Sequence, residues 1–257
     1  MIGRMSDVLG VLRSSVERLA AQVRPLDDEH LVRRAYPSAW SIADVLSHVG
    51  SSGVIMQRRL DDALAGDAMP DEFQEGVWAE WDAKAPRAKA DDGLAADAAF
   101  MSRLESVGAN ARSGLSVPFG PITFTWEEFV RTRLNEHTLH GWDVEVALDP
   151  SATLPPDAVE LVIDNLELIG RFTAHPVAPE RTITVVTSAP ERGFAVTVAA
   201  TTAEFASTDV VPDPAVQMPA EAFIRLVYGR LDADHTPSSV VGDADTLDQL
   251  RQVFPGP

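Results

Sequence analysis

Hydrophobic residues recur at helical spacing through roughly the first 150 residues of the chain. This period is typical of amphipathic helices that bury one face. It predicts four long helices, over residues 6–24, 41–64, 92–112 and 125–149. Four such helices with mostly short connections favour a four-helix bundle.

Turn-forming residues separate the predicted helices. Pro25 ends the first helix, and the capping box Ser41-Ile-Ala-Asp44 starts the second. Residues 66–90 are acidic, rich in alanine and interrupted by prolines, so we expect a surface excursion with one helical turn near residues 77–81. The glycines and prolines of residues 114–121 predict a turn into the fourth helix.

The pattern changes after about residue 150. A helix is expected over residues 157–172, strands over 182–187, 194–199 and 203–208, and helices over 219–228 and 243–253. The first two strands flank a Pro-Glu-Arg-Gly segment, which is a hairpin signal. The expected fold class is therefore α+β with two domains: a helical bundle over residues 1–150, and a small α+β domain with an antiparallel sheet over residues 151–257.

Composition and charge narrow the function classes. The formal net charge of −18 argues against a surface for nucleic acid or anionic membranes, because phosphate binding needs clustered Lys and Arg. The apolar runs are too short to span a bilayer, and the first residues lack the apolar core of a secretion signal. We therefore expect a soluble cytoplasmic protein. The chain has no cysteine, which excludes disulfides, thiolate metal ligands and a cysteine nucleophile.

Glu136 and His140 stand out at the edge of the apolar stripe of the fourth helix. They are one turn apart, so they share one helix face. A carboxylate and an imidazole on a core-facing surface are unfavourable unless something satisfies them, and a divalent metal would do so. His48 in the second helix is the best candidate for a further ligand. His137 is the alternative, although its side chain points about 100° away from Glu136.

Each of these residues also has a purely structural interpretation. His48 alone would be a buried, hydrogen-bonded histidine, and Glu136 with His140 would be a surface pair contributing only a few tenths of a kcal/mol. Asp143 lies on the same face as His140. It would either orient that imidazole as a hydrogen-bond acceptor or stay solvated near the helix end.

Two segments resemble the mycothiol-dependent maleylpyruvate isomerase family: Trp40-Ser-Ile-Ala-Asp-Val-Leu-Ser-His48 and Arg133-Leu-Asn-Glu136-His-Thr-Leu-His140-Gly-Trp-Asp143. The resemblance implies a DinB-like four-helix bundle that holds a divalent metal through His48, Glu136 and His140. Zinc is expected first, and nickel, iron or manganese would suit the same donors. In the second domain, a segment that ends at Gly229-Arg230 resembles the family's sterol-carrier-like small domain.

The resemblance also implies a function. Because the chain has no cysteine, the nucleophile must come from a low-molecular-weight thiol, which in this family is mycothiol. A metal-bound thiolate would attack a small electrophilic substrate, and would either stay attached, as in a transferase, or leave after bond rotation, as in an isomerase. Arg230 is the candidate for binding a substrate carboxylate, and capping of the preceding helix is its alternative role.

A non-enzymatic function is the alternative hypothesis. The second domain would then hold an apolar small molecule, and the metal site of the bundle would be vestigial. The identity of the electrophile and the oligomeric state are left open at this stage.

Overall fold

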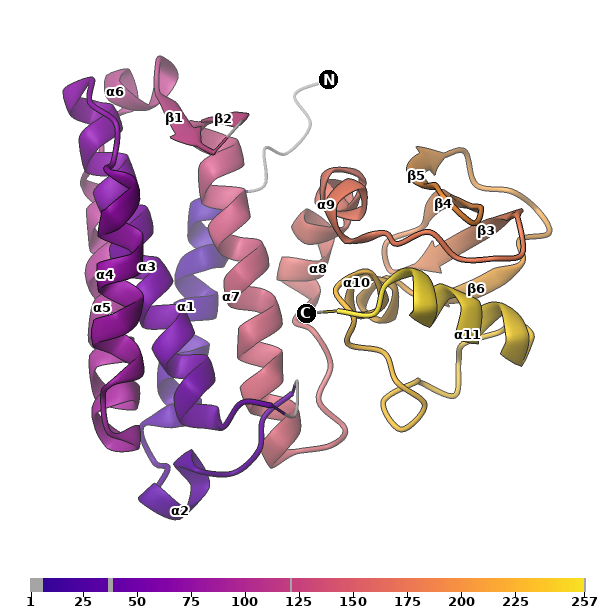
Figure 1. Cartoon of the computed structure of the whole chain (residues 1–257), viewed down its shortest axis with the longest axis horizontal. Helices are drawn as coiled ribbons and strands as arrows, with labels where there is room; N and C mark the ends of the chain where they lie inside the picture. Colours follow the sequence, from indigo (N-terminus) through magenta and orange to yellow (C-terminus); the bar gives the residue numbers. More distant parts are fainter. Residues whose placement is uncertain (1–6, 37–38, 121, 257) are drawn as a thin grey trace. The chain divides into compact units, whose positions relative to one another are not determined.

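The computed structural model describes residues 7–36, 39–120 and 122–256 of the chain. The chain forms two compact units, Met1–Ala152 and Thr153–Pro257 (Figure 1). Ser6 of the predicted first helix and Pro121 of the predicted turn lie outside the described residues. Among the described helices, none has the length and apolar character needed to cross a membrane.

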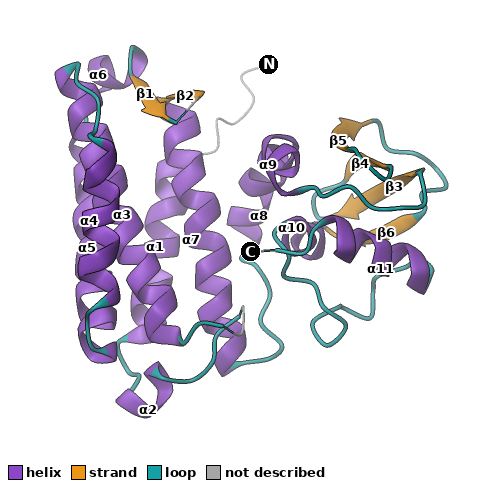
Figure 2. Cartoon of the chain, in the orientation of Figure 1, coloured by secondary structure: helices purple, strands orange, loops and turns teal. Residues whose placement is uncertain are grey.

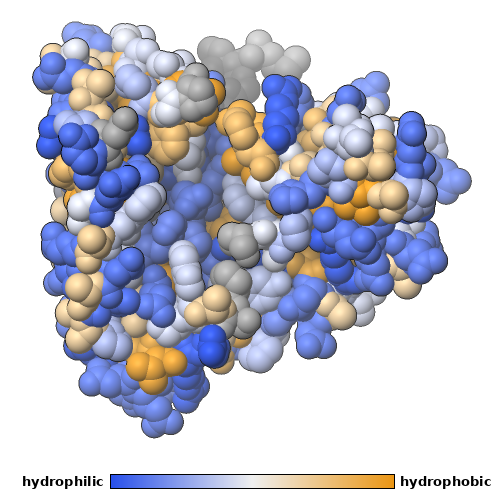
Figure 3. Space-filling model, in the orientation of Figure 1, coloured by the Kyte–Doolittle hydropathy of each residue, from blue (hydrophilic) through white to orange (hydrophobic). Residues whose placement is uncertain are grey.

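Long helices standing side by side dominate the first unit (Figures 1 and 2). The four longest described helices are α1 (Val8–Val23), α3 (Ile42–Ala65), α5 (Pro86–Ser106) and α7 (Trp126–Leu148). Shorter elements connect them: α2 (Asp28–Leu31), α4 (Asp71–Asp82), α6 (Ala109–Ser113), β1 (Ser116–Phe119) and β2 (Ile122–Thr125). The predicted four-helix bundle is confirmed. Hydrophilic side chains cover most of the face of this unit that Figure 3 shows.

Capping boxes start the two helices that matter most for the candidate site. In α3 the Ser41 hydroxyl accepts from the backbone N–H of Asp44 at 3.2 Å, and the Asp44 carboxylate accepts from the backbone N–H of Ser41 at 3.0 Å. In α7, Thr125 and Glu128 form the same reciprocal pair. Each box satisfies two N–H groups that the first helical turn leaves without partners. The first turns of both helices are therefore defined by the local sequence.

The segment between α3 and α5 is helical where the sequence predicts mainly a surface excursion. The helix α4 has 12 residues, and α5 already begins at Pro86. Val77 and Trp81, one turn apart, are buried and pack with Ile55 of α3. Most other residues of α4 are polar or acidic. The apolar stripe is therefore too short to produce a clear helical period in the sequence. A proline at the first helical position is compatible with the fold, because the N–H it lacks would have no partner there.

Two glycines allow α3 to pack closely against α4 and α5. A Cβ atom at Gly93 of α5 would lie 2.6 Å from the carbonyl oxygen of Leu46, and one at Gly50 of α3 would overlap the ring of Trp81. Neither position has room for a larger side chain. The spacing between α3 and its neighbours therefore depends on these two residues.

The predicted turn before α7 is a small β-hairpin. The strands β1 and β2 pair antiparallel, with Val117 opposite Phe124, and both side chains are buried. Each strand has 4 residues, so the alternation is too short to stand out among the surrounding glycines and prolines.

The second unit combines helices with one sheet. Its helices are α8 (Pro156–Val162), α9 (Leu166–Thr173), α10 (Ala220–Val227) and α11 (Ala244–Val253). Its strands are β3 (Arg181–Ser188), β4 (Arg192–Val198), β5 (Ala203–Thr208) and β6 (Val216–Pro219), in the order β5-β4-β3-β6. The α+β fold class is confirmed. The single helix predicted over residues 157–172 is interrupted by a 3-10 turn, Ile163–Asn165.

The sheet is mixed, whereas the sequence predicts an antiparallel one. The strands β3, β4 and β5 pair antiparallel as expected, but β6 joins the other side of β3 in parallel. The strand β6 has only 4 residues and follows a proline-rich segment, so no alternation reveals it. Aromatic rings of Phe194, Phe205, Phe223 and Phe254 contact one another in the interior of the unit.

A buried polar network joins the four long helices of the first unit. Arg133 of α7 donates to the carboxylate of Asp97 in α5 at 2.7 Å and to the Val49 carbonyl in α3 at 3.0 Å. The other carboxylate oxygen of Asp97 is 2.7 Å from Nε2 of His137, whose Nδ1 is 2.8 Å from the Ser15 hydroxyl in α1. Arg133, Asp97 and His137 are all at most 2% exposed. Burial alone would raise the pKa of Asp97, but His137 and Arg133 hold it far below its ordinary value.

Replacing Asp97 by asparagine is expected to destabilise the protein at neutral pH. The change leaves a buried guanidinium without its counter-charge, which costs about 3–5 kcal/mol. Because the pKa of Asp97 is lower in the folded chain than in the unfolded chain, its stabilisation is complete above the ordinary value of 3.8 and declines as the pH falls below it. Urea unfolding of wild type and Asp97→Asn should therefore show a difference in unfolding free energy that is larger at pH 7 than at pH 3.

Asp92→Asn is the matched control on the same helix. The Asp92 side chain is 53% exposed and pairs with Lys84 at 2.9 Å, so its loss should change the unfolding free energy by less than about 1 kcal/mol. An Asp97→Asn effect that is equal at both pH values would contradict the role given to the ionised carboxylate.

Candidate metal centre

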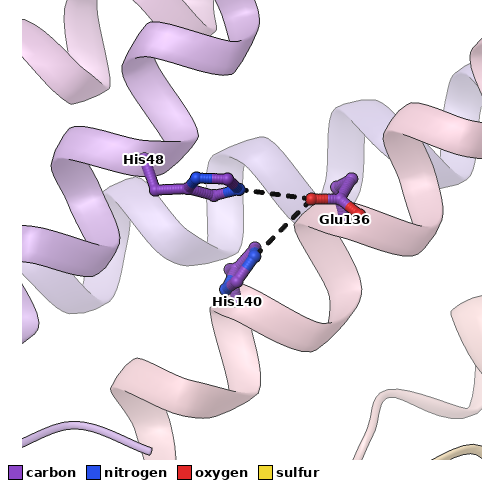
Figure 4. Close-up of side chains that lie close together, drawn as sticks. All are labelled: His48, Glu136 and His140. Carbon is purple, nitrogen blue, oxygen red and sulfur yellow. Dashed lines mark hydrogen bonds and ion pairs between the residues drawn. The ribbon is translucent and has the colours of Figure 1, made fainter. Parts of the chain in front are cut away.

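His48, Glu136 and His140 meet where α3 faces α7 (Figure 4). One oxygen of Glu136 lies 3.3 Å from Nε2 of His48 and 3.5 Å from Nε2 of His140. One candidate ligand atom from each residue lies within 4.8 Å of the other two. Glu136 and His140 are adjacent because they are one turn apart on α7, as expected from their spacing. The structure thus brings together the three residues that the sequence proposes as ligands.

The cluster is closed on one side and open on the other. The side chain of His140 is 11% exposed, whereas those of His48 and Glu136 are 31% and 39% exposed. A small molecule therefore has access to the carboxylate and to the His48 ring from solvent.

Asp143 holds the His140 ring in position. Its carboxylate lies 2.8 Å from Nδ1 of His140, and Asp143 is fully buried. This contact fixes the ring and would keep a proton on Nδ1 when Nε2 gives its lone pair to a metal ion. Of the two roles considered for Asp143, its position is that of the orienting acceptor and not of a solvated carboxylate.

The contacts within the cluster favour the charged forms of Glu136 and His140. Burial would raise the pKa of Glu136, but hydrogen bonds from His140 and His48 lower it well below its ordinary value. Burial would lower the pKa of His140, but its contacts with Asp143 and Glu136 raise it. Glu136 is therefore ionised at neutral pH, which is the state that a metal ligand requires.

Trp40 lies against both imidazoles. Its ring centroid is 5.3 Å from that of His48 and 6.1 Å from that of His140, on which it stacks at 23°. In the sequence, Trp40 stands only as the first residue of the segment that resembles the family. The one local sign of this role is that Trp40 directly precedes the capping box of α3.

Two other predicted residues lie outside the cluster. His137 is fully buried in the network with Asp97 and Ser15, and thus on a different face of α7 from Glu136. Arg230 belongs to the second unit, where it is 4% exposed and donates to the carbonyl of Tyr228 at 2.9 Å. This contact is the one that the capping role of Arg230 requires, and binding of a substrate carboxylate stays a prediction.

The donor set suits a divalent transition metal. Two imidazole nitrogens and one carboxylate oxygen match the three protein ligands of many catalytic zinc sites, which leave a further position open. Nickel, iron and manganese accept the same donors. Among the described residues, this is the one cluster of three such side chains close enough to share an ion.

The fold and the cluster define a class of protein: a helical bundle with a candidate metal centre built from side chains on facing helices. The family model for the mycothiol maleylpyruvate isomerase N-terminal domain matches residues 12–145, just over half of the chain. The chain belongs to this family. The matched range includes His48, Glu136 and His140.

Solved structures share the fold over a longer range. A crystal structure of the mycothiol-dependent maleylpyruvate isomerase superposes with a TM-score of 0.63 and 17% identity, covering 88% of this chain and 90% of the other. A mutant of that enzyme with one histidine replaced by alanine gives a TM-score of 0.64 and 16% identity over the same shares. At this identity the likeness establishes the fold alone. No curated protein sequence matches the chain.

Metal content should depend on the two candidate histidines and not on His137. We expect the purified protein to hold about one divalent ion per chain, and His48→Ala or His140→Ala to lose most of it, because two remaining donors hold an ion poorly at an open site. Elemental mass spectrometry of the dialysed proteins measures this.

Two histidine variants serve as controls. His137→Gln should retain the metal although it perturbs the buried network. His30→Ala removes a partly exposed histidine that contacts Asp27, the N-cap residue of α2. Metal content in His48→Ala equal to that of wild type, together with its loss in His137→Gln, would make His137 the ligand in place of His48.

Proposed function

We propose that the protein is a metal-dependent enzyme that uses mycothiol as its nucleophile, an isomerase or S-transferase acting on a small electrophile. The observation that carries this proposal is the His48–Glu136–His140 cluster, open on one side, in a chain of this family that has no cysteine of its own. The thiol must therefore come from outside the chain.

The chemistry that a divalent cation supplies at such a site is a lower pKa for a thiol in the open position, which favours the thiolate at neutral pH. The residues of the chain are arranged to hold such a cation. His48 and His140 each turn Nε2 toward the shared point, Asp143 keeps the Nδ1 proton of His140 in place, and Glu136 supplies one negative charge.

The thiolate sulfur then forms a bond to an electrophilic carbon, such as one end of a conjugated alkene. In a transferase this carbon–sulfur bond persists in the product, and the carbanion formed beside it takes up a proton. In an isomerase, rotation about the former double bond is followed by cleavage of the carbon–sulfur bond, which restores the alkene and releases the thiol unchanged.

A cobalt-substituted protein tests the binding of the thiol. Addition of mycothiol to the Co²⁺ form should produce a sulfur-to-cobalt charge-transfer band at about pH 7, below the ordinary thiol pKa of about 8.5, because the cation stabilises the thiolate. Absorption spectroscopy measures the band, and His140→Ala treated in the same way is the control. A spectrum unchanged at saturating thiol would favour the alternative of a non-enzymatic binding protein.

We also propose that Arg230 binds a carboxylate of the substrate. In a chain of net charge −18, an anionic substrate needs local positive charge near its site, and a guanidinium binds a carboxylate through two parallel hydrogen bonds that lysine does not reproduce. Arg230→Lys should then leave folding and metal content intact and lower the turnover of an anionic substrate by about tenfold.

Arg251→Lys is the matched control for Arg230→Lys. Arg251 lies in the same unit and donates to a main-chain carbonyl, that of Leu231, at 2.8 Å. Equal turnover in the two variants would assign Arg230 the capping role alone.

A further inference from the structure

The two candidate histidines are held in different ways. The ring of His140 has the Asp143 carboxylate 2.8 Å from its Nδ1. Nε2 of His48 lies 3.3 Å from Glu136 (Figure 4), but among the described residues none accepts a hydrogen bond from Nδ1 of His48. A histidine that binds a metal usually donates its second ring nitrogen to an acceptor, which fixes the orientation of the ring. If His48 is a ligand, another contact has to orient its imidazole.

The indole of Trp40 provides such a contact. Its ring centroid lies 5.3 Å from that of His48, with the two planes inclined at 43°. The His48 ring also packs against that of His140, at 4.6 Å and 63°, and Trp40 stacks on His140 at 6.1 Å. The three rings thus form one packed group. Rotation of the His48 imidazole about its side-chain bonds would break at least one of these ring contacts.

Trp40 is held in place without help from the histidines. The backbone N–H of Ala35 donates to the Trp40 carbonyl at 2.9 Å, and that of Ile42 donates to the Arg33 carbonyl at 2.9 Å. The next residue, Ser41, is the N-cap of α3 and is fixed by its capping box. Trp40 also packs against the buried hydrophobic cluster around α3. The main chain and the core therefore set the position of the indole.

We propose that Trp40 is a positioning residue for the candidate metal centre. Its indole holds the His48 imidazole in the orientation that turns Nε2 toward Glu136. Trp40 does for His48 by ring packing what Asp143 does for His140 by a hydrogen bond. An imidazole that is already fixed loses less conformational entropy when it binds an ion than one that rotates freely. Contacts that orient a ligand typically change metal affinity by about 10–100-fold.

The effect on metal affinity rests on the proposed function, because it requires His48 to be a ligand. The orientation of His48 does not, and NMR of the metal-free, full-length protein tests it. Trp40→Leu keeps an apolar side chain but removes the flat ring. With ¹³C at Cε1 of the histidines, this change should lower the order parameter of the His48 ring and leave that of His140 nearly unchanged, because His140 keeps its contact with Asp143. Trp40→Phe should restore most of the order at His48.

Competition with a chromophoric chelator for Zn²⁺ measures the affinity of the same variants. Trp40→Leu should weaken Zn²⁺ binding by about tenfold, and Trp40→Phe should restore most of it. Trp126→Leu is the matched control. Trp126 is also partly buried and lies next to a capping box, that of α7, but its ring contacts the Arg112 guanidinium, 4.7 Å from the ring centroid. Urea unfolding shows whether each variant is folded, and Trp40→Met replaces Trp40→Leu if the latter is not.

The outcomes separate this proposal from the proposed function. Unchanged order at His48 in Trp40→Leu overturns the proposal, whatever the Zn²⁺ affinity. Equal loss of order at His48 and at the buried His137, or the same loss in Trp126→Leu, assigns Trp40 to packing of the bundle alone and also overturns it. If wild type binds no Zn²⁺ but Trp40→Leu loosens His48 selectively, Trp40 orients the ring and the proposed function fails. Selective loosening with weaker Zn²⁺ binding, both restored in Trp40→Phe, supports the proposal.

Discussion

The buried guanidinium of Arg133 is the contact on which the geometry of the candidate centre depends. It lies on α7 one turn before Glu136, and it donates to the carbonyl of Val49, the residue after His48 on α3. The carboxylate of Asp97 on α5 compensates its charge. The same cation therefore sets the register between the two helices that supply the three candidate ligands. Breaking a buried pair of this kind is strongly unfavourable, so α7 has little freedom to slide along α3.

Those parts of the centre that are encoded locally could be predicted from the sequence. The capping boxes at Ser41 and Thr125 define where α3 and α7 begin, and the spacing of Glu136 and His140 places both on one face. Spacing within one helix does not place His48 beside this pair, because 88 residues separate His48 from Glu136. Chemical reasoning made His48 the best candidate and left His137 as an alternative, and the family resemblance pointed to the same three residues.

The features that the sequence did not reveal depend on contacts between distant segments. The helix α4 is held by Val77 and Trp81 against α3, although its own composition is that of a polar surface. The strand β6 is short and is defined by its partner β3. The sequence leaves His137 as an alternative ligand, because its partners Ser15 and Asp97 lie on two other helices. No period or motif within one segment carries this information.

Ser15, His137 and Asp97 also contact one another in the order hydroxyl, imidazole, carboxylate, which is the order found in serine hydrolases. Here the three are at most 6% exposed, and the carboxylate is shared with Arg133. A search for hydrolase triads by interatomic distance alone would select this group as a catalytic site. In a serine hydrolase the acyl group has a route to the serine oxygen. Around Ser15, four packed helices close that route. The Ser15 hydroxyl, although it contacts an imidazole, is thereby sealed from acyl donors.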